Sequence, residues 1–180
     1  GKTVNYYYYG SYLISFLTNL SGIRYALSYN FALALVYSEA ALLAGMTVFS
    51  LTRSKTASVL GAFMVTTAGT LFFAASTISA WFAGHIYSYA SSTRLYTPSY
   101  IINEIPSYSF TVGDLHAHLL ALPFFLLSII LLFILERSQS FSWLLAFLFS
   151  LSIATSGMIN AWDAITISCI FFLVILIKSV

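Results

Sequence analysis

Long apolar runs separated by short polar segments make up most of the chain. A helix must contain about 20 apolar residues to cross a bilayer core of roughly 30 Å. The pattern predicts membrane-spanning helices over five ranges: residues 28–51, 57–80, 115–135, 141–158 and 164–177. We therefore predict an all-α fold, a polytopic transmembrane helix bundle of about five spans.

Two aromatic-rich segments accompany these spans. Residues 6–22 are apolar but marginal in length for a full span, so we expect a short interfacial or partly inserted N-terminal helix. A polar, tyrosine-rich loop is predicted from Trp81 to about Val112. Residues 1–180 are thus expected to form a single membrane domain. Its parts are an outer interfacial segment (1–22), two spans (28–80), an outer loop (81–114) and three spans (115–178).

Composition supports a membrane protein and excludes several soluble classes. The chain is 60% hydrophobic and 7% charged, with a mean hydropathy of +0.92. These charges are too few to cover the outer faces of soluble helices. The net charge of +2 and the lack of a basic run give no reason to expect nucleic-acid binding. The sequence has no P-loop, dinucleotide fingerprint, HExxH motif or serine nucleophile elbow, so nucleotide hydrolysis is not expected.

Basic residues predict how the chain is oriented. Arg53, Lys55, Arg137 and Lys178 follow alternate spans and fall on one side, which the positive-inside rule makes cytoplasmic. The polar loops and the N-terminal tyrosines then lie on the extracytoplasmic side of a multi-pass protein of the cell membrane. The chain begins at Gly1 without a methionine, so we also expect a fragment of a longer protein.

The main candidate for chemistry is a polar cluster that precedes the 115–135 span. It holds Glu104 and Asp114, two of the five acidic residues, and His116 and His118, two of the three histidines. Ionisable groups gathered beside a bilayer indicate a functional site. We predict a helix start with Asp114 as its N-cap, which places Asp114 and His118 on one face and His116 elsewhere. The three converge only if the helix start is irregular.

Several roles remain open for these groups. Glu104 and Asp114 are candidate general bases, and Asn103 and the two histidines are candidate substrate contacts. Asp114, His116 and His118 are candidate ligands of a divalent metal ion, such as Mn, Mg or Zn, with Glu104 as a further ligand. The alternative is a capped helix start with interfacial histidines and a solvated loop acid.

A second polar motif lies in the turn before the last span. Either Asp163 caps that helix while Trp162 anchors the membrane interface, or Asp163 and Asn160 bind a polar ligand. Glu39, in the middle of the first span, is either protonated and structural or part of a polar cavity or proton path.

Four consecutive tyrosines begin the 6–22 segment. They are either an aromatic belt at the interface or a surface on which sugars or lipid-linked head groups stack. The four residues are Tyr6, Tyr7, Tyr8 and Tyr9.

Three stretches carry a resemblance to a known family. They are Gly1-Lys-Thr-Val-Asn5-Tyr-Tyr-Tyr-Tyr9-Gly10, the run from Asn103-Glu104-Ile-Pro through Gly113-Asp114-Leu-His-Ala-His118 to Pro123, and Asn160-Ala-Trp162-Asp163. Together they resemble the highly hydrophobic "YYY" membrane proteins of archaea and some bacteria, a family of unknown function. Its membrane region is similar to the C-type glycosyltransferases, which use lipid-phosphate-linked sugars at the outer face. The resemblance implies a further acidic residue upstream of Gly1.

Three functions follow from these features. The first is a glycosyltransferase-like enzyme, a hexosyltransferase, that acts on polyprenyl-phosphate sugars at the outer face of the membrane. The second is a non-catalytic membrane subunit, and the third is a transporter that uses Glu39. The expected partners are membrane lipid, a polyprenyl-phosphate sugar, and other membrane subunits or the missing part of the same protein; no nucleic acid is expected.

Overall fold

The computed structural model describes residues 7–69, 71–85, 105–138 and 140–179, and within these ranges it contains helices and no strand. The all-α prediction is therefore confirmed. The helices are α1 (Tyr9–Ser21), α2 (Tyr25–Thr52), α3 (Lys55–Thr66), α4 (Leu71–Phe82), α5 (Pro106–Val112), α6 (Ala117–Arg137), α7 (Trp143–Ile159) and α8 (Ala161–Ser179).

Three of these helices are long and apolar enough to cross a membrane. They are α2, α6 and the Ala161–Lys178 part of α8, which correspond to three of the predicted spans. The predicted span 141–158 is the apolar helix α7, which has only 17 residues. The short N-terminal helix is also present, because α1 has 13 residues.

The prediction of one continuous span over 57–80 is wrong. The chain forms two helices of 12 residues each, α3 and α4, on either side of a break. The backbone N–H groups of Thr67 and Ala68 both donate to the carbonyl oxygen of Phe63, and Gly69 adopts a left-handed conformation with φ 64°. A left-handed glycine is a common end to a helix, and here it outweighs the apolar composition of the segment.

The predicted loop 81–112 is also partly helical. Helix α4 continues to Phe82, and Pro106 begins the short helix α5, where its missing N–H and fixed φ are tolerated. Residues 86–104 lie outside the described ranges. The consequence is that a helix, rather than a loop, leads into the Asp114 turn.

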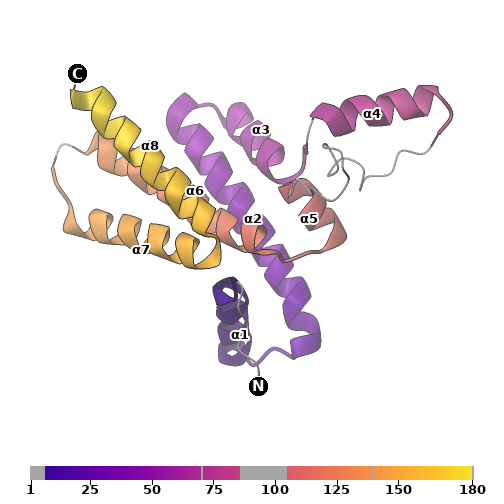
Figure 1. Ribbon diagram of the computed structural model, residues 1–180, viewed down its shortest axis with the longest axis horizontal. Helices are drawn as coiled ribbons and strands as arrows, with labels where there is room; N and C mark the ends of the chain where they lie inside the picture. The colour runs from indigo at the N-terminus through magenta and orange to yellow at the C-terminus, as the bar shows by residue number, and fades with distance from the viewer. Residues whose placement is uncertain (1–6, 70, 86–104, 139, 180) are drawn as a thin grey trace.

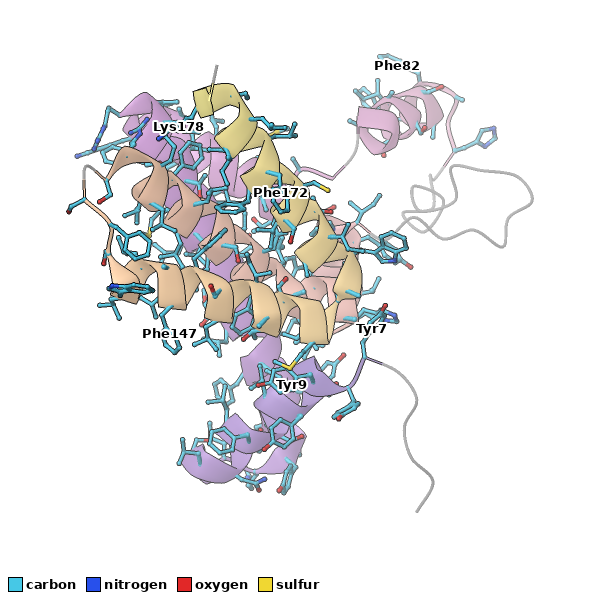
Figure 2. All side chains as sticks on the ribbon, turned by 60° about the vertical axis from the view of Figure 1, so that its left-hand side comes forward. Tyr7, Tyr9, Phe82, Phe147, Phe172 and Lys178 are labelled. Atoms are coloured by element: carbon cyan, nitrogen blue, oxygen red, sulfur yellow. The ribbon has the colours of Figure 1, made fainter. Side chains whose placement is uncertain are left out.

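Helix α6 is the centre of the packed region and contacts α2, α7 and α8 (Figure 1). Small residues let α2 and α3 approach closely, since a Cβ atom built on Gly61 would lie 2.5 Å from a methyl group of Val48. Large side chains on the outer faces, such as Phe147 and Phe172, each 62% exposed, are placed to meet lipid (Figure 2).

The C-terminal ends of α2, α6 and α8 meet at one end of the bundle, here called the basic end. The Arg137 guanidinium donates to the carbonyl oxygen of Ser50 over 3.2 Å. The Lys178 ammonium lies 3.1 Å from a carboxylate oxygen of Glu136. Antiparallel packing puts the start of α6 and the end of α7 at the opposite end, here called the histidine end.

Candidate functional site

The turn between α5 and α6 presents the candidate acid and histidines at the histidine end. Gly113, with φ 72°, ends α5, and the N–H of Asp114 donates to the carbonyl oxygen of Ser109 over 2.9 Å. This is the bond pattern of a Schellman motif. Asp114 therefore closes α5 and does not cap α6, which corrects our prediction. The N-cap residue of α6 is His116, in extended conformation.

The irregular start of α6 brings three predicted groups together. Carboxylate oxygen Oδ2 of Asp114 lies 3.4 Å from Nδ1 of His116. The ring centroids of His116 and His118 lie 5.8 Å apart. The Nε2 atom of His118 lies 3.0 Å from the hydroxyl oxygen of Ser109 on α5. The side chains of His116 and Asp114 are 38% and 54% exposed, so this pair is open to a substrate.

A tyrosine from α2 holds this turn in place. The Tyr29 hydroxyl donates to the carbonyl oxygen of Gly113 over 2.7 Å and accepts from the N–H of Leu115 over 3.1 Å. The two bonds fix the backbone on either side of Asp114. Sequence reasoning missed Tyr29, because nothing in a stretch of apolar and aromatic residues marks one tyrosine as the partner of a distant turn.

The second predicted motif forms its own cluster where α7 ends and α8 begins. The Asn160 amide donates to one carboxylate oxygen of Asp163 over 3.0 Å, and the fully buried Ser156 hydroxyl lies 3.5 Å from the other. Asp163 is in the first turn of α8, where the helix dipole favours a negative charge. Trp162 is 71% exposed. Binding of a polar ligand by Asn160 and Asp163 stays a prediction.

The Asp114 cluster and the Asp163 cluster both border the same group of buried apolar side chains. Leu120, two residues after His118, and Ile159, which precedes Asn160, pack in the same group of buried side chains. No hydrogen bond within the described ranges joins the Asp114 cluster to the Asp163 cluster. The structure therefore places both at the histidine end without making them a single site.

The tyrosines separate into two environments. Tyr9 packs against the apolar cluster of the histidine end and stacks on Tyr12 at 6.0 Å. Tyr7 and Tyr8, just before α1, are 39% and 61% exposed. Figure 2 labels Tyr7 there. Tyr9 thus has a packing role, whereas Tyr7 and Tyr8 are accessible. Three further predicted residues, Tyr6, Asn103 and Glu104, lie outside the described ranges.

The predicted metal ligands are not gathered into a full set by the described residues. These residues contain no group of three or more His, Cys, Asp or Glu side chains arranged to hold a metal ion. Asp114 and His116 are close enough to act as a pair, but the further predicted ligand, Glu104, is not among the described residues. Binding of Mn, Mg or Zn stays a prediction.

Apolar hollows open between α1 and α2 and reach the histidine end. One, of about 390 Å³, is lined by side chains that include Leu17, Phe31 and Leu35. A second, of about 260 Å³, continues from Leu17 and Leu35 to Leu120 at the histidine end, and Glu39 lies on its wall. The exposed position of Glu39 within the long apolar helix α2 is unusual, because no basic residue lies nearby along that helix.

The helical fold, the apolar spans and the exposed aromatic faces define a membrane protein. The chain belongs to the family described as "Uncharacterized membrane protein (DUF2298)", which it matches over residues 1–180. The resemblance to a membrane family of unknown function is thereby confirmed at this level. No curated protein and no solved structure matches the chain at a significant level.

Proposed function

We propose that this chain is the membrane part of an enzyme that transfers a sugar from a lipid-phosphate donor to an acceptor hydroxyl at the extracytoplasmic face. The observation that carries the proposal is the Asp114–His116 pair, whose Oδ2 and Nδ1 atoms lie 3.4 Å apart at the open histidine end. A carboxylate that orients an imidazole is a common arrangement for a general base.

The reaction requires one proton acceptor and stabilisation of one leaving group. The acceptor oxygen loses its proton and forms a bond to the anomeric carbon, while the bond from that carbon to the phosphate oxygen breaks. With Nδ1 facing Asp114, the His116 ring presents Nε2 to accept the proton. The phosphate leaves with the bonding electrons, and its charge needs a nearby cation. A divalent metal ion would supply that charge if His118 and Glu104 held it, which leaves Asp114 and His116 as the base.

The apolar hollows suit the lipid part of such a donor. A polyprenyl tail needs an apolar surface that leads from the bilayer to the reacting phosphate. The hollows between α1 and α2 supply one, because Leu17 and Leu35 line both and Leu120 brings the second to within two residues of His118. Exposed Tyr7 and Tyr8, at the start of α1, are placed to stack on a sugar or on the first isoprene units.

Glu39 favours a second candidate function, a subunit that binds another membrane protein. A carboxyl group exposed in the middle of a span is costly against lipid and is expected to face a partner or a cavity. A helix with a basic or hydrogen-bonding side chain would satisfy it. This function requires no chemistry at the histidine end.

A transfer assay decides between the two functions. The full chain in lipid vesicles is offered a panel of polyprenyl-phosphate sugars, beside Asp114→Asn, His116→Gln and Glu104→Gln. We expect transfer to fall about 100-fold or more in Asp114→Asn and His116→Gln, as for loss of a general base. The control is Glu136→Gln, which removes an acid at the basic end. Absence of transfer with every donor, or full activity in both Asp114→Asn and His116→Gln, would overturn the enzyme proposal.

A further inference from the structure

A cavity with a mixed polar and apolar wall, here called the α5 cavity, lies where α3 stops and α5 begins. Helix α3 ends at Thr66, part of the way along α2, and α5 packs beyond its C-terminal end (Figure 1). The cavity between α2, α3 and α5 has a volume of about 410 Å³, within the range of about 300–1,000 Å³ that is typical of small-molecule sites. It is separate from the apolar hollows, which lie on the α1 side of α2.

Apolar atoms make up most of the cavity wall, and hydroxyl groups and one amide supply its polar part. These polar side chains belong to Asn30, Tyr37, Thr66, Thr67, Ser107 and Thr111. None of the described residues that line it is charged. Polar side chains in an apolar bundle are costly to bury unless they are hydrogen-bonded. Hydroxyls and amides both donate and accept hydrogen bonds, so the wall matches a ligand that is itself rich in neutral hydroxyl groups.

Two of these hydroxyl side chains are held firmly. Thr66, at the end of α3, and Ser107, on α5, are only 2% and 4% exposed, and the Thr66 hydroxyl donates to the carbonyl oxygen of Ala62 over 2.9 Å. The hydroxyl groups of Tyr37 and Thr67 lie 2.9 Å apart, which fixes the Tyr37 side chain across the junction of α2 and α3. The wall is thus prearranged, and a ligand need not order it.

The cavity also offers an aromatic surface. The rings of Tyr37 and Phe110 meet edge to face, with centroids 4.9 Å apart and planes at 81°. Both residues line the cavity, together with the apolar residues Leu33 and Ala34. An aromatic surface beside several neutral hydrogen-bonding groups fits the mixed apolar and hydroxylated faces of a saccharide. A charged ligand would find no opposite charge among the described residues of this wall.

Helix α5 links the cavity to the histidine end. On one face Ser109 contacts His118, and on another Ser107 and Thr111 line the cavity. On α2, Tyr29 holds the Asp114 turn, and the next residue, Asn30, lines the cavity. The cavity and the Asp114–His116 pair therefore share two supporting elements.

We infer that this cavity binds a neutral saccharide, and that it holds the acceptor sugar of the proposed transfer. The binding of a saccharide follows from the lining alone. Only its role as acceptor rests on the proposed function.

Saccharide binding can be measured by saturation-transfer NMR on the full chain in lipid nanodiscs, with the methyl glycosides of common hexoses as probes. We expect Asn30→Leu and Thr67→Val to weaken the binding of at least one glycoside about tenfold, as for loss of a hydrogen bond to a buried ligand. Thr67→Ser keeps the hydroxyl and should bind as the unchanged chain does. Thr166→Val, which removes an exposed hydroxyl from α8, is the matched control and should have no effect.

The outcomes separate this inference from the proposed function. Saturation of no glycoside, or equal saturation in Thr67→Val and Thr67→Ser, would overturn the inference even if sugar transfer is observed. Asp114→Asn should retain glycoside binding and lose transfer. If glycoside binding depends on Thr67 but the chain transfers no sugar from any donor, the saccharide site is supported. The proposed enzyme function is then overturned.

Discussion

The hydroxyl group of Tyr29 donates a hydrogen bond to the carbonyl oxygen of Gly113 over 2.7 Å, although the two residues are 84 positions apart in sequence. The hydroxyl oxygen of Tyr29 in turn accepts a hydrogen bond from the N–H of Leu115. The turn that carries Asp114 is therefore attached to α2, which also lines the apolar hollows and the α5 cavity. Movement of α2 would move the candidate base.

Replacement of Tyr29 tests this attachment. Tyr29→Phe removes both hydrogen bonds and keeps the ring, so we expect a loss of about 1–3 kcal/mol in local stability. Hydrogen exchange at the amide of Leu115 should become faster by the corresponding factor, and sugar transfer should fall. Tyr12→Phe, on an exposed tyrosine, is the control. Unchanged exchange at Leu115 would show that the turn is held by other contacts.

Gly10 tests the contact of α1 with the bundle. A Cβ atom at this position would lie 2.8 Å from a methyl group of Leu120 and 3.1 Å from one of Ile159. We expect Gly10→Ala to displace α1 at a cost of about 1–3 kcal/mol, because the core cannot absorb the added methyl group. Thermal unfolding in nanodiscs measures this cost. Ser11→Ala, at the exposed neighbour, should change the free energy of unfolding little.

Two serines join α6 to α7. The hydroxyl oxygens of Ser128 and Ser152 lie 2.9 Å apart, and they are 2.8 and 2.9 Å from the carbonyl oxygen of Phe124. Hydrogen bonds between membrane helices contribute about 0.6 kcal/mol on average and up to roughly 1.7. A double-mutant cycle with Ser128→Ala and Ser152→Ala should give a coupling energy in this range. Additive effects would show that the two hydroxyls act independently, and Ser150→Ala provides an exposed control.

Cysteine labelling tests the orientation of the bundle. In a Cys169→Ser background, we expect Trp162→Cys to react with a membrane-impermeant maleimide from the extracytoplasmic side. Ser54→Cys, at the basic end, should react only after the membrane is opened. Labelling of both cysteines from the same side would exclude the arrangement in which α2 and the α7–α8 pair place these residues on opposite faces.

Composition and the length of the apolar runs were enough to predict the long apolar helices. Packing against other helices supports these helices but is not what makes them form. Helix α6 has 21 residues and lies close to the predicted span 115–135, because an uninterrupted apolar run has few alternatives in a bilayer. The break after α3 was missed because it depends on the left-handed backbone of Gly69 and on the bonds to the Phe63 carbonyl. Hydropathy is insensitive to both.

The candidate site was predicted in its residues but not in its geometry. The density of acids and histidines marked Asp114, His116 and His118. A regular helix start, however, would have turned His116 away from the other two. The Schellman motif at Gly113 changes this, since it assigns Asp114 to the end of α5. The α5 cavity was not predicted, because its polar side chains come from α2, α5 and the end of α3 and are each unremarkable in sequence.

The short length of α3 has a consequence for the membrane around it. Twelve residues rise about 18 Å, well short of a hydrocarbon core of roughly 30 Å. Lipids that face α3 therefore meet a protein wall of reduced hydrophobic thickness, and a bilayer adapts to such a mismatch by thinning locally. Head groups and water would be drawn inward beside the exposed Thr67, at the C-terminal end of α3. The membrane interface beside α3 would therefore lie closer to the bilayer centre than elsewhere. A lipid-linked sugar that approaches from this side would already be at that depth.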